Sequence, residues 1–281
     1  PSSVSVIENE SFCGCSKLTK ISIPSCVTKI GSKAFHGCSS IKEISIPSSL
    51  TTIADHLFYD CSKLEKFKIS ASVTTIQDYA FCECKSLKEI IIPSSVTEIG
   101  KESFHGCDSL TTISIPSTVT KIGSYAFDHC SSIKIISIPS SLTTIVDGLF
   151  KDCSKLEKFT ISASVTTIQD CAFCECKSLK EIIIPSSVTE IGRETFYGCE
   201  SLTTISIPST VTKIGSKAFY GCSSIKEILI PSNVTKIEEQ TFASCSSLTH
   251  IEIPESVTLI GEFAFEGCSS LKKIEIPHSI T

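Results

Sequence analysis

The sequence contains neither tryptophan nor methionine, and it has only five tyrosines among its 281 residues. No uninterrupted apolar run approaches the roughly eighteen residues that a membrane-spanning helix requires, so direct membrane insertion is not predicted. An excess of one charge is also missing, because 25 basic and 30 acidic residues are interspersed and give a formal net charge of −5. This balance argues against nucleic acid and against anionic membrane surfaces as partners.

The amino end, Pro-Ser-Ser-Val, lacks both an initiator methionine and the charged-then-apolar pattern of a secretory leader. We therefore expect the chain to be a segment of a longer protein. What the sequence does have is isoleucine, valine, serine and threonine in abundance, with hydrophobic residues making up 41% of the chain. This composition favours strands over helices.

A period of 23 residues runs through the whole chain without an insertion. Isoleucine recurs at this step from Ile23 to Ile276, phenylalanine from Phe12 to Phe265, and cysteine from Cys15 to Cys268. A period in this range is typical of a solenoid, in which each coil buries its apolar face against its neighbours. The sequence therefore predicts one domain over residues 1–281, built from twelve stacked coils.

Most coils follow the pattern Leu-x-x-Ile-x-Ile-Pro, as in residues 87–93, in which the last two isoleucines alternate with outward positions; Ser70 and Ser162 are the two departures from the proline. Proline ends this strand because it cannot donate to a β-ladder. The following Val-Thr-x-Ile segment, as in residues 96–99, predicts a second narrow sheet, and the glycine after it is expected to permit the tight return of the coil. Ala-Phe then lies on a turn, where the phenylalanine rings stack between the sheets. The expected fold is a β-rich leucine-rich-repeat solenoid, a curved right-handed rod with a parallel β-sheet on its concave face.

A second, longer repeat lies over the first. Residues 39–130 and 131–222 align without gaps and differ at 13 of 92 positions, which indicates duplication of a four-coil block. The differing pairs are expected at the surface, and they include Glu43/Ile135, Tyr79/Cys171, His105/Tyr197 and His129/Gly221.

The unit at residues 92–107, Ile-Pro-Ser-Ser-Val-Thr-Glu-Ile-Gly-Lys-Glu-Ser-Phe-His-Gly-Cys, resembles the BspA-like, or Treponema-type, leucine-rich repeat. The resemblance covers essentially the whole chain. In some coils the glycine is replaced, which we expect to loosen the turn and leave the fold unchanged; the replacements are Ala54, Gln77, Val146, Gln169 and Glu238. The resemblance implies a cell-surface or secreted protein that adheres to host or extracellular-matrix proteins.

Seventeen cysteines raise the question of disulfides or metal. Twelve belong to the 23-residue column, where parallel side chains do not offer the torsion that a disulfide needs, so we predict buried free thiols. The other five are expected outside the interior, as candidates for oxidation or metal binding: Cys13, Cys26, Cys82, Cys171 and Cys174.

Neither a metal site nor a cofactor nor an enzyme active site is predicted. Cys82, His105 and Asp128 fall on successive coils and resemble a zinc ligand set, but the duplicated block has Cys174, Tyr197 and Tyr220 instead. The six histidines share no recurring functional setting and are expected to be exposed. A solenoid without insertions also offers no loop to build a pocket.

The outward positions of the first strand form the most extended predicted surface and the candidate partner-binding site. Its proposed contact residues are Lys66, Glu89, Ile91, Thr112, Ile135, Lys158, Glu181, Ile183 and Leu229. Equally, the alternating charges could only stabilise cross-strand neighbours, and the repeats could be a structural spacer without a ligand. We also expect terminal coils with exposed edges that allow end-to-end self-association, and the sequons at Asn9 and Asn233 are consistent with a secretory route.

Overall fold

A computed structural model of the chain describes residues 4–280. They form a parallel-strand β-solenoid of about 11 turns of about 23 residues, and these residues contain no helix. The β-rich solenoid is thus confirmed, with a turn count close to the predicted twelve. The chain divides into two compact units, Pro1–Ser141 and Leu142–Thr281, and the expectation of a single domain stays a prediction.

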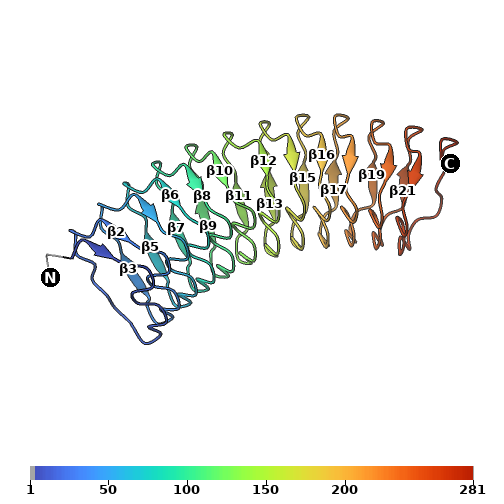
Figure 1. Ribbon diagram of the computed structural model, residues 1–281. Helices are drawn as coiled ribbons and strands as arrows, with labels where there is room; N and C mark the ends of the chain where they lie inside the picture. The colour runs from blue at the N-terminus through green and yellow to red at the C-terminus, as the bar shows by residue number, and fades with distance from the viewer. Residues whose placement is uncertain (1–3, 281) are drawn as a thin grey trace. The chain divides into compact units, whose positions relative to one another are not determined.

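Two sets of short strands alternate along the first unit (Figure 1). The strands that follow the leucine position are β3 (Glu43–Ser45), β5 (Lys66–Lys68), β7 (Glu89–Ile91), β9 (Thr112–Ser114) and β11 (Ile135–Ser137). The second set consists of β1 (Val6–Ile7), β2 (Lys29–Ile30), β4 (Thr52–Ile53), β6 (Thr75–Ile76), β8 (Glu98–Ile99) and β10 (Lys121–Ile122).

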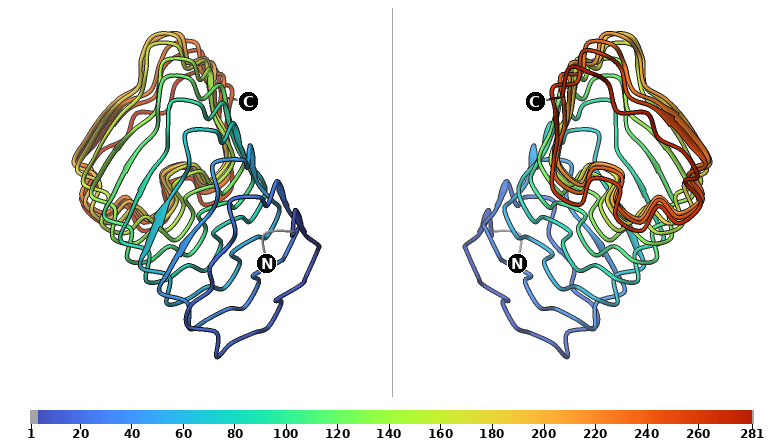
Figure 2. Two further views of the ribbon diagram at one scale, coloured as in Figure 1. Left: turned by 90° about the vertical axis from the view of Figure 1, so that its left-hand side faces the viewer. Right: turned by 90° about the vertical axis from the view of Figure 1, so that its right-hand side faces the viewer.

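The second unit repeats this plan. Its first set is β13 (Lys158–Thr160), β15 (Glu181–Ile183), β17 (Thr204–Ser206), β19 (Glu227–Leu229) and β21 (His250–Glu252). Its second set is β12 (Thr144–Ile145), β14 (Thr167–Ile168), β16 (Glu190–Ile191), β18 (Lys213–Ile214), β20 (Lys236–Ile237) and β22 (Leu259–Ile260). In the end-on views of Figure 2 the last coils of this unit follow nearly the same path.

Every strand pairs in parallel with the equivalent strand one coil away, 23 residues along the chain. In the first unit the orders are β3-β5-β7-β9 and β4-β6-β8-β10, so the predicted second narrow sheet is confirmed. Glu89 is in register with Lys66 and Thr112, and Ile91 with Lys68 and Ser114. This register places identical positions of successive coils side by side, because the period has no exceptions.

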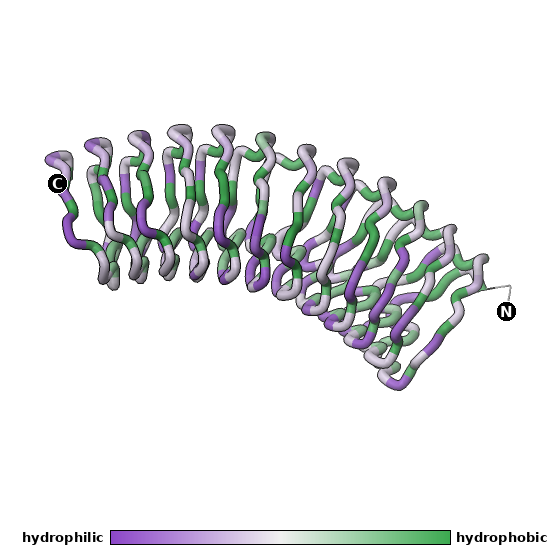
Figure 3. Tube along the Cα trace, turned by 180° about the vertical axis from the view of Figure 1, so that it is seen from behind, coloured by the Kyte–Doolittle hydropathy of each residue, from purple (hydrophilic) through white to green (hydrophobic). Residues whose placement is uncertain are grey.

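Hydrophobic and hydrophilic residues alternate along the coils (Figure 3), and side-chain burial follows the strand alternation. In the coil of β7, Ile90 and Ile92 are buried, while Ile91 between them is 75% exposed. Burial decreases at the last coil, where Ile276 is 56% exposed although its equivalent Ile253 is buried. Exposed terminal edges and end-to-end self-association stay predictions.

The interior of each unit contains a column of stacked phenylalanines. Phe104, for example, is fully buried between Phe81 and Phe127, with ring centroids 5.4 and 5.5 Å away and ring planes 4° from parallel in both pairs. The cysteine column lies beside it, and all seventeen cysteines are free thiols. The thiol of Cys107 donates to the carbonyl oxygen of Phe81 at 3.3 Å, and the same contact recurs in most coils. Ten of the twelve column thiols are buried as predicted, whereas Cys15 is exposed and Cys268 is half-buried. The column thiols also satisfy backbone carbonyls.

Serine and threonine hydroxyls connect adjacent coils. Ser95 donates to the carbonyl of Val73 at 2.6 Å, and Thr97 donates to that of Thr74 at 3.3 Å. These carbonyls lie 22 or 23 residues earlier in the chain, so each hydroxyl satisfies a backbone acceptor of the preceding coil. The high content of these residues thus has a structural role.

The glycine that follows the second strand has a different role from the one predicted. A Cβ atom at Gly100 would lie 2.5 Å from the backbone nitrogen of Asp78 in the preceding coil, so glycine is needed there for close approach of two backbones. The left-handed residues of the turn lie further along, at two positions per coil; in one coil these are Tyr79, with φ of 56°, and Glu83, with φ of 61°.

Candidate functional site

The outward positions of the first strand set form, in each unit, the surface that we call the outward sheet face. In the first unit it carries five of the predicted contact residues, Lys66, Glu89, Ile91, Thr112 and Ile135, and all are exposed. In the second unit it carries the other four, Lys158, Glu181, Ile183 and Leu229, which are exposed as well. The structure thus places each of them where the strand pattern predicted, and their part in binding stays a prediction.

Large apolar side chains are unusually exposed on this face. Ile91 and Ile135 are 75% and 68% exposed in the first unit, and Ile183 and Leu229 are 74% and 66% exposed in the second. Ile91 has Lys68 and Ser114 beside it in register, so each apolar side chain stands among polar neighbours. Isolated anchors of this kind suit contact with a partner protein better than they suit binding of a small molecule.

Charged residues on the face pair across adjacent strands. Lys158 lies in register with Glu181, and its Nζ is 3.8 Å from Glu181 Oε1. Both side chains are about 60% exposed, at 64% and 59%, so the pair contributes little to stability. Their charges remain accessible to a partner.

A shallow hollow of about 290 Å³ lies beside Leu229 in the second unit. Ile207, Ile230, Pro231 and Pro254 contribute apolar atoms to its lining, with Glu252 at its margin. It would accept one aliphatic or aromatic side chain of a partner next to the Leu229 anchor.

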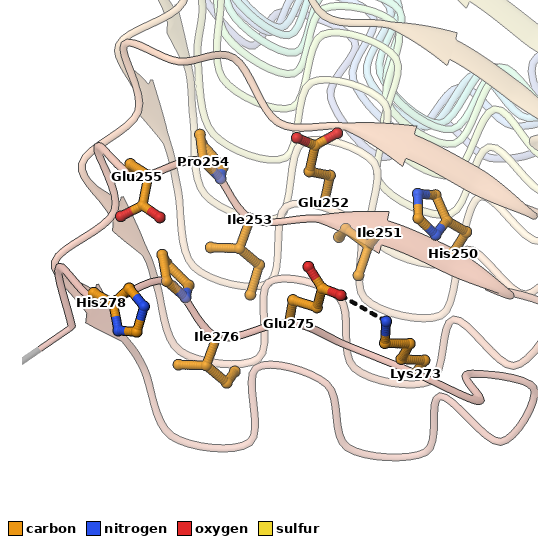
Figure 4. Close-up of a pocket in the computed structure, with 11 residues that line it drawn as sticks. His250, Ile251, Glu252, Ile253, Pro254, Glu255, Lys273, Glu275, Ile276 and His278 are labelled. Carbon is orange, nitrogen blue, oxygen red and sulfur yellow. Dashed lines mark hydrogen bonds and ion pairs between the residues drawn. The ribbon is translucent and has the colours of Figure 1, made fainter.

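A second hollow, of about 520 Å³, lies between β21 and residues 273–278 (Figure 4). His250 and Glu252 on β21 are exposed, and Lys273 Nζ donates to Glu275 Oε1 at 2.6 Å. Its lining residues include no serine, threonine or cysteine.

The turn that follows each phenylalanine brings together a cluster of titratable side chains in the first unit. This His105 cluster consists of Cys82, Glu83, His105, Asp128 and His129, from three successive coils. Asp128 lies between the histidines, with Oδ2 3.1 Å from His105 Nδ1 and Oδ1 2.8 Å from His129 Nδ1. The hydrogen bond to Asp128 raises the pKa of His105, although desolvation opposes it.

Several sequence expectations about these turns were wrong. Cys82 and Cys174 are buried, at 2% and 6% exposure, and burial raises the pKa of Cys82 to about 12. In addition, His36, His56 and His105 are half-buried instead of exposed. Two of the pairs that differ between the duplicated blocks, Tyr79/Cys171 and His105/Tyr197, were expected at the surface. Their side chains are also half-buried.

Two members of the cluster, Glu83 and His129, were missed from the sequence. The expected ligand pattern used only the position directly after the phenylalanine, whereas these residues come one position later. Both have left-handed backbones, with φ of 61° and 58°, so the alternation of strands does not apply to them. Two adjacent positions of one coil can therefore reach the same cluster.

Aromatic stacks occupy the same turns elsewhere. His36 stacks on Tyr59 at 4.8 Å between ring centroids, and His56 stacks on Tyr79 at 4.4 Å. In the second unit Tyr197 stacks on Tyr220 at 4.7 Å. The turns thus present flat, half-buried rings.

Among the residues described, no helix has the length and apolarity to cross a membrane.

The model of the BspA type leucine rich repeat region matches the chain in six copies, over residues 1–107, 51–180 and 170–281. A leucine-rich repeat protein of Bacteroides ovatus is 30% identical, with a TM-score of 0.71, and the match covers 98% of this chain and 83% of that one. A leucine rich cell surface protein of Faecalibacterium prausnitzii is 34% identical, with a TM-score of 0.69, covering 98% and 77% of the two chains. The pneumococcal vaccine antigen PcpA is 20% identical, with a TM-score of 0.51, covering 100% and 71%, and shows the shared fold alone. No curated protein matches the chain.

Proposed function

Because the chain belongs to the BspA-type leucine-rich repeat family, we propose that it is a non-enzymatic protein-interaction module of a cell-surface or secreted adhesin. Its ligand class would be host or extracellular-matrix proteins, bound through the outward sheet face. The description of the Faecalibacterium relative as a cell surface protein supports the location. Leucine-rich repeat solenoids are generally scaffolds for protein interaction, which supports the mode of action.

The observation that carries the proposal is the exposure of the four apolar side chains on the face. Strands with one solvated face ordinarily place polar residues there. The same column carries Lys68 and Thr160 one coil before Ile91 and Ile183, so the strand itself does not require an apolar residue. Exposed isoleucine at these points is therefore better explained by a partner than by folding.

The spacing of the anchors suggests how binding would occur. Ile91 and Ile135 lie two coils apart in the first unit, as do Ile183 and Leu229 in the second. At roughly 4.8 Å per coil, each pair is separated by at least about 10 Å, too far to form one apolar patch. Several weak contacts with an extended partner would add through avidity.

A binding screen against immobilised matrix and plasma proteins tests the proposal. The matched variant is Ile91→Lys/Ile183→Thr, which installs residues that the same column already has one coil earlier. The control is Glu98→Lys/Glu190→Lys on the second sheet, where lysine also occurs in other coils, for example Lys121. We expect saturable binding by the parent chain and the control, and at least about tenfold weaker binding by the apolar double variant, since two anchors of about 1 kcal/mol each are removed.

The alternative is a spacer that projects other parts of a longer protein and has no ligand. The regularity of the coils favours it, because blocks 39–130 and 131–222 differ at only 13 positions and a dedicated binding surface usually varies more. If the folded chain binds nothing in the screen, or if the apolar variant binds as well as its parent, the proposed adhesive face is wrong.

A further inference from the structure

We propose that His105, Asp128 and His129 form a binding site for one divalent transition-metal ion of the zinc type. One donor atom from each residue lies within 4.8 Å of the others. Asp128 contacts both histidines at short range, with Oδ2 3.1 Å from His105 Nδ1 and Oδ1 2.8 Å from His129 Nδ1. The site goes beyond the adhesive function and does not depend on it.

The distances suit tetrahedral coordination. Zinc lies about 2.0–2.2 Å from histidine nitrogen and carboxylate oxygen, so neighbouring ligand atoms are separated by about 3.3 Å. Because the two contacts use different oxygens of Asp128, the carboxylate would turn one oxygen toward the ion, and the imidazoles would adjust around it until the donor atoms are about 3.3 Å apart. Two imidazoles with one carboxylate favour zinc, nickel or copper over magnesium or calcium, which prefer oxygen ligands alone.

The unequal burial of the three side chains leaves the ion one route of access from solvent, beside His129. The Asp128 side chain is 8% exposed and that of His105 is 24% exposed, whereas that of His129 is 49% exposed. Three protein ligands would hold the ion from the protein side, and the fourth position would face solvent beside His129. A nearly buried carboxylate between two histidines is well suited to hold a cation, because the low local dielectric strengthens the attraction.

Glu83 provides the outer contact that histidine ligands usually have. Its Oε1 is 3.4 Å from His105 Nε2, and Lys85 holds its other oxygen at 3.0 Å. A carboxylate at one ring nitrogen keeps the proton there and leaves the lone pair of the other nitrogen for the metal. Glu83 thus directs His105 Nδ1 toward Asp128.

Cys82 belongs to a different group with Glu83 and His105, on the Nε2 side of the ring. Cys82 is 2% exposed, and burial raises the pKa of its thiol to about 12. The two nitrogens of one imidazole point in opposite directions, so a single ion cannot use both groups. We assign the ion to the more accessible set, without a thiolate.

The duplicated block supplies a matched control within the same chain. Residues 92 positions later have the same turn with Tyr197, Tyr220 and Gly221 in place of the three ligands, while Glu175 remains. The variant His105→Tyr/His129→Gly therefore introduces residues that this turn already accommodates. His56→Gly is a second substitution of this type, because its equivalent is Gly148, and it removes a histidine outside the site.

Cobalt(II) titration of the reduced 281-residue chain, followed by absorbance and by equilibrium dialysis, tests the site. We expect one ion per chain with visible bands of a four-coordinate nitrogen and oxygen set, and the same result for His56→Gly. His105→Tyr/His129→Gly should bind at least tenfold more weakly. Zinc chloride should displace the cobalt.

A thiolate-to-cobalt band in the near ultraviolet would overturn the assignment, because the ion would then be bound by cysteine. Absence of saturable binding, or equal binding by the double variant, would also overturn it. If circular dichroism shows that the double variant is unfolded, Asp128→Asn decides the matter, since it keeps the shape of the side chain and removes its charge. Unchanged affinity in Asp128→Asn would refute the site, and a loss of at least tenfold would support it.

Discussion

The stacked phenylalanines should dominate the stability of each coil, and Phe104→Ala tests this directly. Phe104 is fully buried and has a ring neighbour on each side. Truncation of a buried phenylalanine to alanine costs about 3–5 kcal/mol, because apolar surface is lost and a cavity remains. Each stacked pair adds about 0.5–1.5 kcal/mol beyond burial. We therefore expect a loss near the upper end, about 5 kcal/mol.

Two further variants separate the contributions. Phe104→Leu keeps most of the apolar volume and loses both stacks, so we expect a cost of about 1–3 kcal/mol. Phe263→Ala makes the same truncation as Phe104→Ala at a side chain that is 58% exposed, and should cost no more than about 0.5 kcal/mol.

Urea unfolding followed by circular dichroism measures these differences. With a slope of about 3 kcal/mol per molar urea, the midpoint of Phe104→Ala should fall by about 1.7 M, and that of Phe263→Ala should barely move. A shift for Phe104→Ala no larger than that for Phe263→Ala would refute the role of the stack. These midpoint shifts assume that unfolding is a single cooperative transition. A smaller slope of the unfolding free energy against urea concentration would show instead that the coils unfold in separate steps.

Three other predictions concern thiols, a histidine and a glycine. In the native chain a maleimide should modify the exposed Cys13 and Cys15 quickly, and the buried thiols of the column only after unfolding. The reason is that burial raises the pKa of a thiol, as it does for Cys107. Mass spectrometry of the labelled peptides shows which cysteines have reacted. Burial, followed by the charge of nearby His56, lowers the pKa of His36. The folded state therefore favours the neutral imidazole, and the stability contributed by His36 is present above about pH 6.5 and lost as the pH falls. His36→Tyr should reduce the drop in urea midpoint between about pH 7.5 and pH 5.5, and an unchanged drop would contradict this. Gly100→Ala should cost about 1–3 kcal/mol in the same assay, because its Cβ would meet the backbone of the preceding coil, and a neutral result would show that the coils separate easily.

Much of the fold could be predicted from the sequence because the pattern has a fixed period. Ile90 and Ile92 lie on either side of Ile91 along one extended segment, where successive side chains point to opposite faces. Their positions in the segment therefore indicate that Ile90 and Ile92 are buried and that Ile91 is exposed. A strict 23-residue step without insertions also fixes the register, since any other pairing would place apolar residues against polar ones. The outward sheet face therefore followed from the sequence, residue by residue.

The turns were less predictable, because their backbone has no simple period. Left-handed residues such as Glu83 and His129 redirect side chains in a way that alternation cannot describe. The glycine at position 100 was interpreted as a turn residue, yet its neighbour is a backbone 22 residues away in sequence, which only the stacked structure reveals.

By itself, the sequence determined the repeat, the strands, the buried columns of phenylalanine and cysteine, and the exposed isoleucines, because each depends on spacing along one chain. Only the tertiary structure decided which turn side chains meet. His105 comes from one coil, and Asp128 and His129 come from the next. Stacking brings the two turns together, so that His105 Nδ1 lies within hydrogen-bonding distance of Asp128.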